Sequence, residues 1–172
     1  MKINGENNQN LGELLPRLEA TLSTSEFLQR IRRFSELDPE NFLVGNVVVD
    51  GKSYPVVVGE HVRKRCAQRT FLTMEGILEK AIRWLSSPMV GPRVVEDPVL
   101  WDEESHDVVP FEEEGHVGTC LQLEEENLIL IFEAGFNYIR VKTIYEGISD
   151  FKSAHDDLKL RVSKCGAIQV VE

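Results

Sequence analysis

The chain has 172 residues, with 19 Lys+Arg against 29 Asp+Glu and a formal net charge of −10. Hydrophobic residues make up 42%, which is enough to bury the core of one domain and excludes wholesale disorder. No apolar run approaches the roughly 18 residues that a membrane span needs. The polar start of the chain also lacks the apolar core of a signal peptide. An acidic chain argues against non-specific coating of nucleic acid, but it leaves room for a local basic site.

The first predicted elements are a helical extension over residues 1–40 and a β-hairpin after it. The extension is predicted from apolar residues that recur at helical spacing. The hairpin has strands over 43–49 and 54–58, joined through Asp50-Gly51, a pair that favours turns because both residues tolerate positive φ. Pro55 has no backbone N–H to donate, so the second strand should be an edge at that point.

Two helices and an acidic segment are expected next. A short helix over about 61–68 precedes a second helix, which Thr73 can cap and which carries an apolar stripe up to Leu85. Residues 94–126 contain twelve acidic residues and no Lys or Arg, and about 94–115 should form a long surface insertion. Because this segment holds twelve of the negative charges, the rest of the chain carries a net charge of +2.

The later part of the chain predicts further strands and a final helix. Runs at 117–123, 128–133 and 138–145 follow one another closely, as in an antiparallel meander. A helix over about 149–164 should end before Gly166, and a short strand over 168–171 could follow it. The predicted fold class is α+β, with helices packed on an antiparallel sheet made of the hairpin and the three-stranded meander. The predicted parts are a helical extension at 1–40, an α+β domain at 41–146 with its acidic insertion, and a C-terminal helix and tail at 147–172.

Histidine and cysteine spacing gives little support for a metal or disulfide. Cys66, Cys120 and Cys165 are scattered and form no CxxC pair, so a disulfide framework or structural zinc site is not expected. His106 and His116 lie among carboxylates, but their spacing matches no known ligand set. We therefore expect a cytoplasmic protein that uses no cofactor and no metal.

The residues that best suit chemistry lie on the first of the two helices. His61, Arg65 and Arg69 are spaced by four residues, so they advance by about 40° per step and share one helix face. Val62 and Cys66 would turn a neighbouring face to the core. Arginine matches phosphate oxygens with a planar fork, and histidine can move a proton near neutral pH. The alternative is a solvated helix whose cations form ion pairs, including a latch onto the acidic insertion.

A resemblance to a known group follows from the order of these features. A strand leads into H-x-x-x-R-x-x-Q-R at 61–69, then a Thr-led helix, then strands ending in I-R-V-K-T-I-Y at 139–145. This order resembles the toxin-like domains of the BrnT and RelE type, which belong to a group of metal-independent ribonuclease folds. It covers about residues 47–145, with the acidic segment as an insertion. Thr70 departs from the pattern, because a glycine is usual there. The positions that match are His61, Arg65, Gln68, Arg69, Val141, Thr143, Ile144 and Tyr145.

The resemblance implies a phosphodiester site shared by the helix and the last strand of the meander. His61, Arg65 and Arg69 would be its catalytic residues, with Gln68 binding substrate beside them. Strand alternation sends Arg140 and Lys142 to one face and Thr143 and Tyr145 to the other. Thr143 or Tyr145 could also complete the site, but since the sheet needs a core face, Arg140 and Lys142 are the better candidates to bind substrate. Their alternative role is an ordinary solvent-facing strand.

Two functions remain open from the sequence. The first is a toxin-like, metal-independent endoribonuclease whose basic helix binds RNA phosphate, and which the acidic insertion could cover. The second is a non-catalytic interaction module of the same fold that docks a basic partner through its acidic insertion. The expected partners are accordingly RNA, a cognate antitoxin-like protein or another basic protein, and no membrane.

Overall fold

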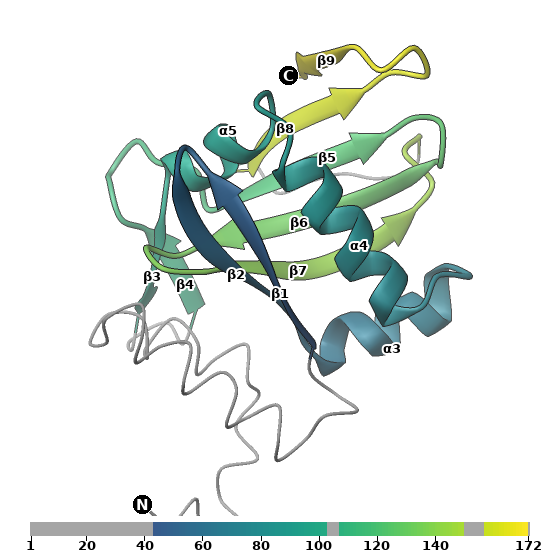
Figure 1. Ribbon diagram of the computed structural model, residues 1–172, viewed down its shortest axis with the longest axis horizontal. Helices are drawn as coiled ribbons and strands as arrows, with labels where there is room; N and C mark the ends of the chain where they lie inside the picture. Colours follow the sequence, from purple (N-terminus) through teal and green to yellow (C-terminus); the bar gives the residue numbers. More distant parts are fainter. Residues whose placement is uncertain (1–42, 103–106, 150–156, 172) are drawn as a thin grey trace, which may run out of the picture.

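The computed structural model describes residues 43–102, 107–149 and 157–171 (Figure 1). The predicted helical extension at 1–40 and His106 lie outside these residues. The order of the described elements is β1, β2, α3, α4, α5 and then β3 to β9. A seven-stranded sheet forms the body, and β3 and β4 form a separate two-stranded sheet beside it.

The predicted hairpin is confirmed as β1 (Leu43–Val49) and β2 (Lys52–Val58). The strands pair antiparallel with Val49 opposite Lys52, so the turn consists of Asp50 and Gly51 alone. Both turn residues have positive φ, 50° and 79°, as a two-residue turn between right-twisted strands requires. Pairing of β2 with its other neighbour begins only at Val56, so the prediction for Pro55 is also confirmed.

Helices α3 (Glu60–Arg69) and α4 (Met74–Leu85) follow where the sequence predicts them. The Thr73 side chain accepts a hydrogen bond from the Gly76 backbone N–H at 3.1 Å and caps α4. The buried side of α4 packs over the hairpin, and α4 lies very close to β1. A Cβ at Gly45 of β1 would lie 2.5 Å from Ile82 Cδ1, so α4 crosses β1 at a position that suits glycine. The α4 residues in the core are Met74, Ile77, Ala81 and Leu85.

The acidic segment is more ordered than a plain surface insertion. It begins in α5 (Gly91–Glu96), whose Val94 is buried in the main core. The two-stranded sheet then pairs β3 (Val99–Asp102) with β4 (Asp107–Pro110). The insertion is therefore anchored through apolar residues, while its carboxylates at Glu112, Glu113 and Glu114 remain exposed.

The meander is present as β5 (Gly118–Leu123), β6 (Leu128–Ala134) and β7 (Ile139–Glu146). The predicted antiparallel sheet is nevertheless wrong, because the sheet is mixed. Its order is β1-β2-β7-β6-β5-β8-β9, and β2 pairs parallel to β7. A second parallel pairing joins β5 to β8. Parallel neighbours need a long connection, so the short turns on which the prediction rested could not reveal them.

The prediction of a C-terminal helix over 149–164 is wrong where the structure describes this segment. Residues Asp157–Val162 form β8, and Ile168–Val170 form the antiparallel strand β9. Leu158, Leu160 and Val162 alternate toward the core, whereas Lys159 and Arg161 point to the other face. This period of two is a strand pattern, and pairing with β5 buries it. The domain prediction of a C-terminal helix at 147–172 is corrected in the same way.

The two faces of the sheet carry cores of different size. The main core lies between the sheet and the helices and includes Phe132, Leu130 and Val141. The opposite face carries a smaller cluster of Cys120, Ile129 and Ile131, against which Tyr145 packs. Helices α4 and α5 cover one face, whereas α3 lies at the border of the sheet next to β7 (Figure 1).

Candidate functional site

The position of α3 follows from the point at which β2 leaves the sheet. β2 pairs with β7 only from Val56 to Val58, and α3 begins at Glu60 after Gly59. The helix then lies against β7, in the place that a longer β2 would occupy. Val62 and Cys66 are buried and anchor it, as the sequence predicts. The adjoining face of α3, with His61, Arg65 and Arg69, borders the face of the sheet that α4 and α5 leave uncovered.

His61 lies in a strongly positive environment. Partial burial of its imidazole lowers its pKa below the ordinary value of 6.5. The charges of Arg65 and Arg69 lower the pKa further, followed by those of Arg140 and Lys64. Arg65 and Arg69 share a face of α3 with His61, and Arg140 belongs to β7. The structure therefore brings α3 and the last strand of the meander together. The imidazole is therefore neutral at pH 7 and can accept a proton.

Arg65 and Gln68 form a small unit on the exposed side of α3. The Arg65 Nη1 donates to Gln68 Oε1 at 3.2 Å, within one turn of the helix. Among the described residues no carboxylate forms an ion pair with Arg65. By contrast, Arg63 and Lys64 lie 3.7 and 3.6 Å from Glu60 Oε1 in exposed pairs, which contribute little stability. Arg65 is therefore the α3 cation that has most capacity left for an anionic ligand.

Arg69 has a clear structural contact as well. Its Nη1 donates to the Ile144 carbonyl oxygen at 3.0 Å, and its guanidinium stacks over the Tyr145 ring at 4.0 Å. The Ile144 carbonyl lies beyond Val141, the last residue of β7 that pairs with β2. Arg69 therefore supplies a hydrogen bond to a backbone carbonyl that β2 does not reach. A guanidinium has five N–H donors, so this contact leaves donors for a phosphate.

A β-bulge in β7 corrects the predicted alternation of its side chains. Phe132 pairs with Val141 and Ile131 pairs with Thr143, so Lys142 is the extra residue. The extra residue shifts the alternation by one position. Arg140, Lys142, Thr143 and Tyr145 therefore share the face opposite the main core, and the predicted division of Arg140 and Lys142 from Thr143 and Tyr145 is wrong.

The two cations of β7 are held by Glu133, a residue that the sequence reading missed. Glu133 is paired directly opposite Arg140 across β6 and β7, and its side chain has no exposed area. It accepts a charge-assisted hydrogen bond from Arg140 Nη2, and Lys142 Nζ lies 2.9 Å from its Oε1. Glu133 is the one carboxylate inside the apolar run LILIFEA, and this position could have indicated a buried counter-ion, because such a charge needs a partner on a neighbouring strand.

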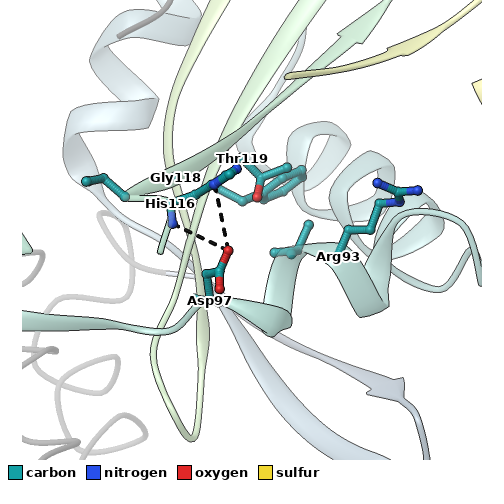
Figure 2. A pocket seen from close by; sticks show the side chains of 9 residues that line it. Arg93, Asp97, His116, Gly118 and Thr119 are labelled. Atoms are coloured by element: carbon teal, nitrogen blue, oxygen red, sulfur yellow. Dashed lines mark hydrogen bonds and ion pairs between the residues drawn. The ribbon is translucent and has the colours of Figure 1, made fainter. Parts of the chain in front are cut away.

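The described part of the acidic segment forms no ion pair with α3. Glu126 pairs with Lys80 of α4 at 3.2 Å instead. The Asp97 carboxylate accepts from the His116 backbone N–H at 3.4 Å and lies 3.7 Å from its Nδ1. Asp97 and His116 border a small pocket between α5 and β5, together with Arg93 and Thr119 (Figure 2). The predicted latch between α3 arginines and the insertion is not present in residues 43–102, 107–149 and 157–171.

Within the described chain, no group of three or more His, Cys, Asp or Glu side chains is placed to hold a metal ion. None of the described helices combines the length and the apolar character needed to cross a membrane. The sequence matches no protein-family model, and comparisons with curated proteins and with solved structures find no match either. Functional inference for this chain therefore depends on the geometry of α3 and β7.

Proposed function

We propose that this chain is a cytoplasmic, toxin-like protein that binds RNA on the basic face of α3 and cleaves it without a metal. His61 would act as the general base, and Arg65 and Arg69 would bind the scissile phosphate. Arg140 and Lys142 would raise the local positive potential, and Gln68 would orient Arg65. The observation that carries this proposal is the His61 imidazole on the same helix face as Arg65 and Arg69 and near Arg140, whose charges, together with partial burial, lower its pKa and favour the neutral form that accepts a proton.

The chemistry needs only groups that this face can supply. The neutral imidazole takes the proton of the ribose 2′-hydroxyl as its oxygen forms a bond to phosphorus. The bond from phosphorus to the 5′-oxygen breaks, that oxygen takes a proton from water, and a 2′,3′-cyclic phosphate remains. The guanidiniums of Arg65 and Arg69 stabilise the charge that develops on the phosphorane oxygens.

The test is cleavage of labelled RNA by the purified protein with a chelator present. Wild type should cleave, His61→Ala should lose about 10²- to 10⁴-fold in rate, and Arg65→Gln should weaken binding. Arg63→Gln is the matched control, because Arg63 is on the same helix but pairs with Glu60. RNA left intact by wild type across a range of salt concentrations would refute the catalytic part. Equal RNA affinity in wild type and Arg65→Gln would refute the binding part.

A second function is favoured by the exposed carboxylates of the insertion. Glu112, Glu113 and Glu114 are consecutive and exposed, and no described cation pairs with any of them. Such a cluster would bind a basic protein surface, including an antitoxin-like partner, by electrostatic complementarity. A fluorescent oligolysine peptide is the probe. Replacing all three residues by glutamine should reduce its affinity, and unchanged affinity would remove this alternative.

A further inference from the structure

The most exposed aromatic side chain of the described residues lies two positions after the end of α3. Phe71 has 104% of its reference accessible area, whereas the other exposed phenylalanines, Phe111 and Phe136, have 52% and 37%. Those two also contact one another edge to face, with ring centroids 4.9 Å apart. Phe71 thus presents its whole ring to solvent, in the connection that extends past the sheet between α3 and α4 (Figure 1).

The backbone on both sides of Phe71 is held by hydrogen bonds. The Thr70 N–H donates to the Cys66 carbonyl at 2.9 Å, and the Leu72 N–H donates to Thr70 Oγ1 at 3.1 Å. The Cys66 thiol also donates to the Leu72 carbonyl at 2.6 Å. Leu72 packs against the main core, and Thr73 caps α4. The ring is therefore carried outward by a fixed connection, with flanking residues that are themselves anchored.

Phe71 also follows the end of α3 directly in the chain. Two peptide units separate it from Arg69, so the two Cα atoms are at most about 7.6 Å apart. Thr70 has an extended backbone, with φ −142° and ψ 170°, which carries the chain away from the helix end. Proteins hold single-stranded nucleic acid by combining exposed rings with phosphate-binding arginines, since each base offers a π-face. The end of α3 and the connection after it carry both kinds of residue in one short stretch of chain.

We propose that Phe71 is a stacking platform for an unpaired base, and that the substrate class of the α3 site is single-stranded RNA. This inference rests on the proposed function, because Arg65 and Arg69 must hold the phosphate next to that base. Bases inside a duplex are stacked on one another and cannot cover the Phe71 ring. The site should therefore prefer single strands over duplexes of equal charge.

The test compares two labelled probes by fluorescence anisotropy: a short oligoadenylate and an RNA duplex with the same number of phosphates. Phe71→Ala should weaken oligoadenylate binding by about 5- to 150-fold and leave duplex binding unchanged. Phe71→Trp should retain or increase the affinity for oligoadenylate. Phe111→Ala is the matched control, because it removes another exposed ring that lies in the acidic insertion, and it should change neither affinity.

Failure of this inference and failure of the proposed function give different results. If Arg65→Gln weakens oligoadenylate binding but Phe71→Ala does not, the stacking role is wrong and the phosphate site stands; the ring then serves another partner, such as a protein. Equal losses for single strand and duplex in Phe71→Ala would also overturn the stacking role. If wild type binds neither probe, the proposed function itself is refuted. The melting temperature of Phe71→Ala should equal that of wild type, because the ring buries no area.

Discussion

The cations of α3 and those of β7 come from one predicted site, but the structure gives them different surroundings. Arg140 and Lys142 lie on the buried carboxylate of Glu133. Arg65 lies on the surface of α3 with a neutral glutamine as its hydrogen-bond partner. A cation that already neutralises a buried charge is part of the fold, whereas a cation without a carboxylate is available to an anionic ligand. The difference separates residues that support the site from residues that would bind RNA.

The largest expected effect is a loss of stability when Glu133, which holds the β7 cations, is replaced. Glu133→Ala removes the buried carboxylate that pairs with Lys142 and with Arg140, whose side chain is only 16% exposed. We expect the free energy of unfolding to fall by about 3 to 5 kcal/mol, measured by urea denaturation. The exposed Glu125→Ala serves as the control and should stay within about 0.5 kcal/mol of wild type. Equal stabilities for the two variants would show that Glu133 does not hold the β7 cations.

Replacement of Arg69 is expected to have an effect of intermediate size on stability, because Arg69 makes a structural contact and also lies on the basic face of α3. Arg69→Ala removes the hydrogen bond to the Ile144 carbonyl and the stack on Tyr145. The loss of unfolding free energy should be about 1 to 2 kcal/mol. Arg69→Lys keeps the charge but lacks the planar fork, so it should recover only part of this loss. Full recovery by lysine would mean that charge alone matters there.

Arg65 should affect ligand binding but hardly affect stability. Arg65→Gln is expected to change the unfolding free energy by no more than about 0.5 kcal/mol. If Arg65 contacts one phosphate, the slope of log affinity against log salt for single-stranded RNA should fall by about 0.7. Titrations at several salt concentrations measure this slope, and Arg63→Gln should change it less because Glu60 already pairs with Arg63.

The smallest effect is the titration of His61. Its pKa in the folded chain is lowered, so the unfolded chain binds a proton more readily and the contribution to stability is present above pH 6.5. This contribution is lost as the pH falls through the folded-state pKa. Cleavage should rise with pH along a limb below pH 6.5, where His61 loses its proton. In Arg65→Gln the limb should move to higher pH, and an NMR titration of His61 would measure the pKa directly.

Local patterns were sufficient for most elements of this fold. The Asp50-Gly51 turn, the Thr73 cap and the three strands of the meander depend on residues near one another in sequence. The parallel pairings depend on residues far apart, so local sequence patterns could not predict them. In β8 the alternation of Leu158 and Leu160 with Lys159 and Arg161 is a local strand pattern, and the prediction of a helix there is wrong.

The candidate site was predictable in its helical part and not in its strand part. The i, i+4 spacing of His61, Arg65 and Arg69 sets their shared face whatever surrounds the helix. The faces of β7 depend on the bulge at Lys142, which no residue type in that run signals. Glu133 could be recognised as a buried counter-ion only once its pairing with Arg140 was known. The exposure of Phe71 could not be predicted from the sequence, because it depends on how the ends of α3 and α4 are held.

The two parallel pairings have a consequence for how the chain reaches its native state. The meander of β5, β6 and β7 closes through short turns, so it can form early as a nucleus with low contact order. Val56 must then find Ile139 across more than eighty residues, and β8 must dock on β5. Until both steps are complete, β7 and β5 expose unpaired edges that invite association with other chains. Folding should therefore be slow and concentration-sensitive, and a chain lacking β8 should aggregate through β5 even though its meander is intact.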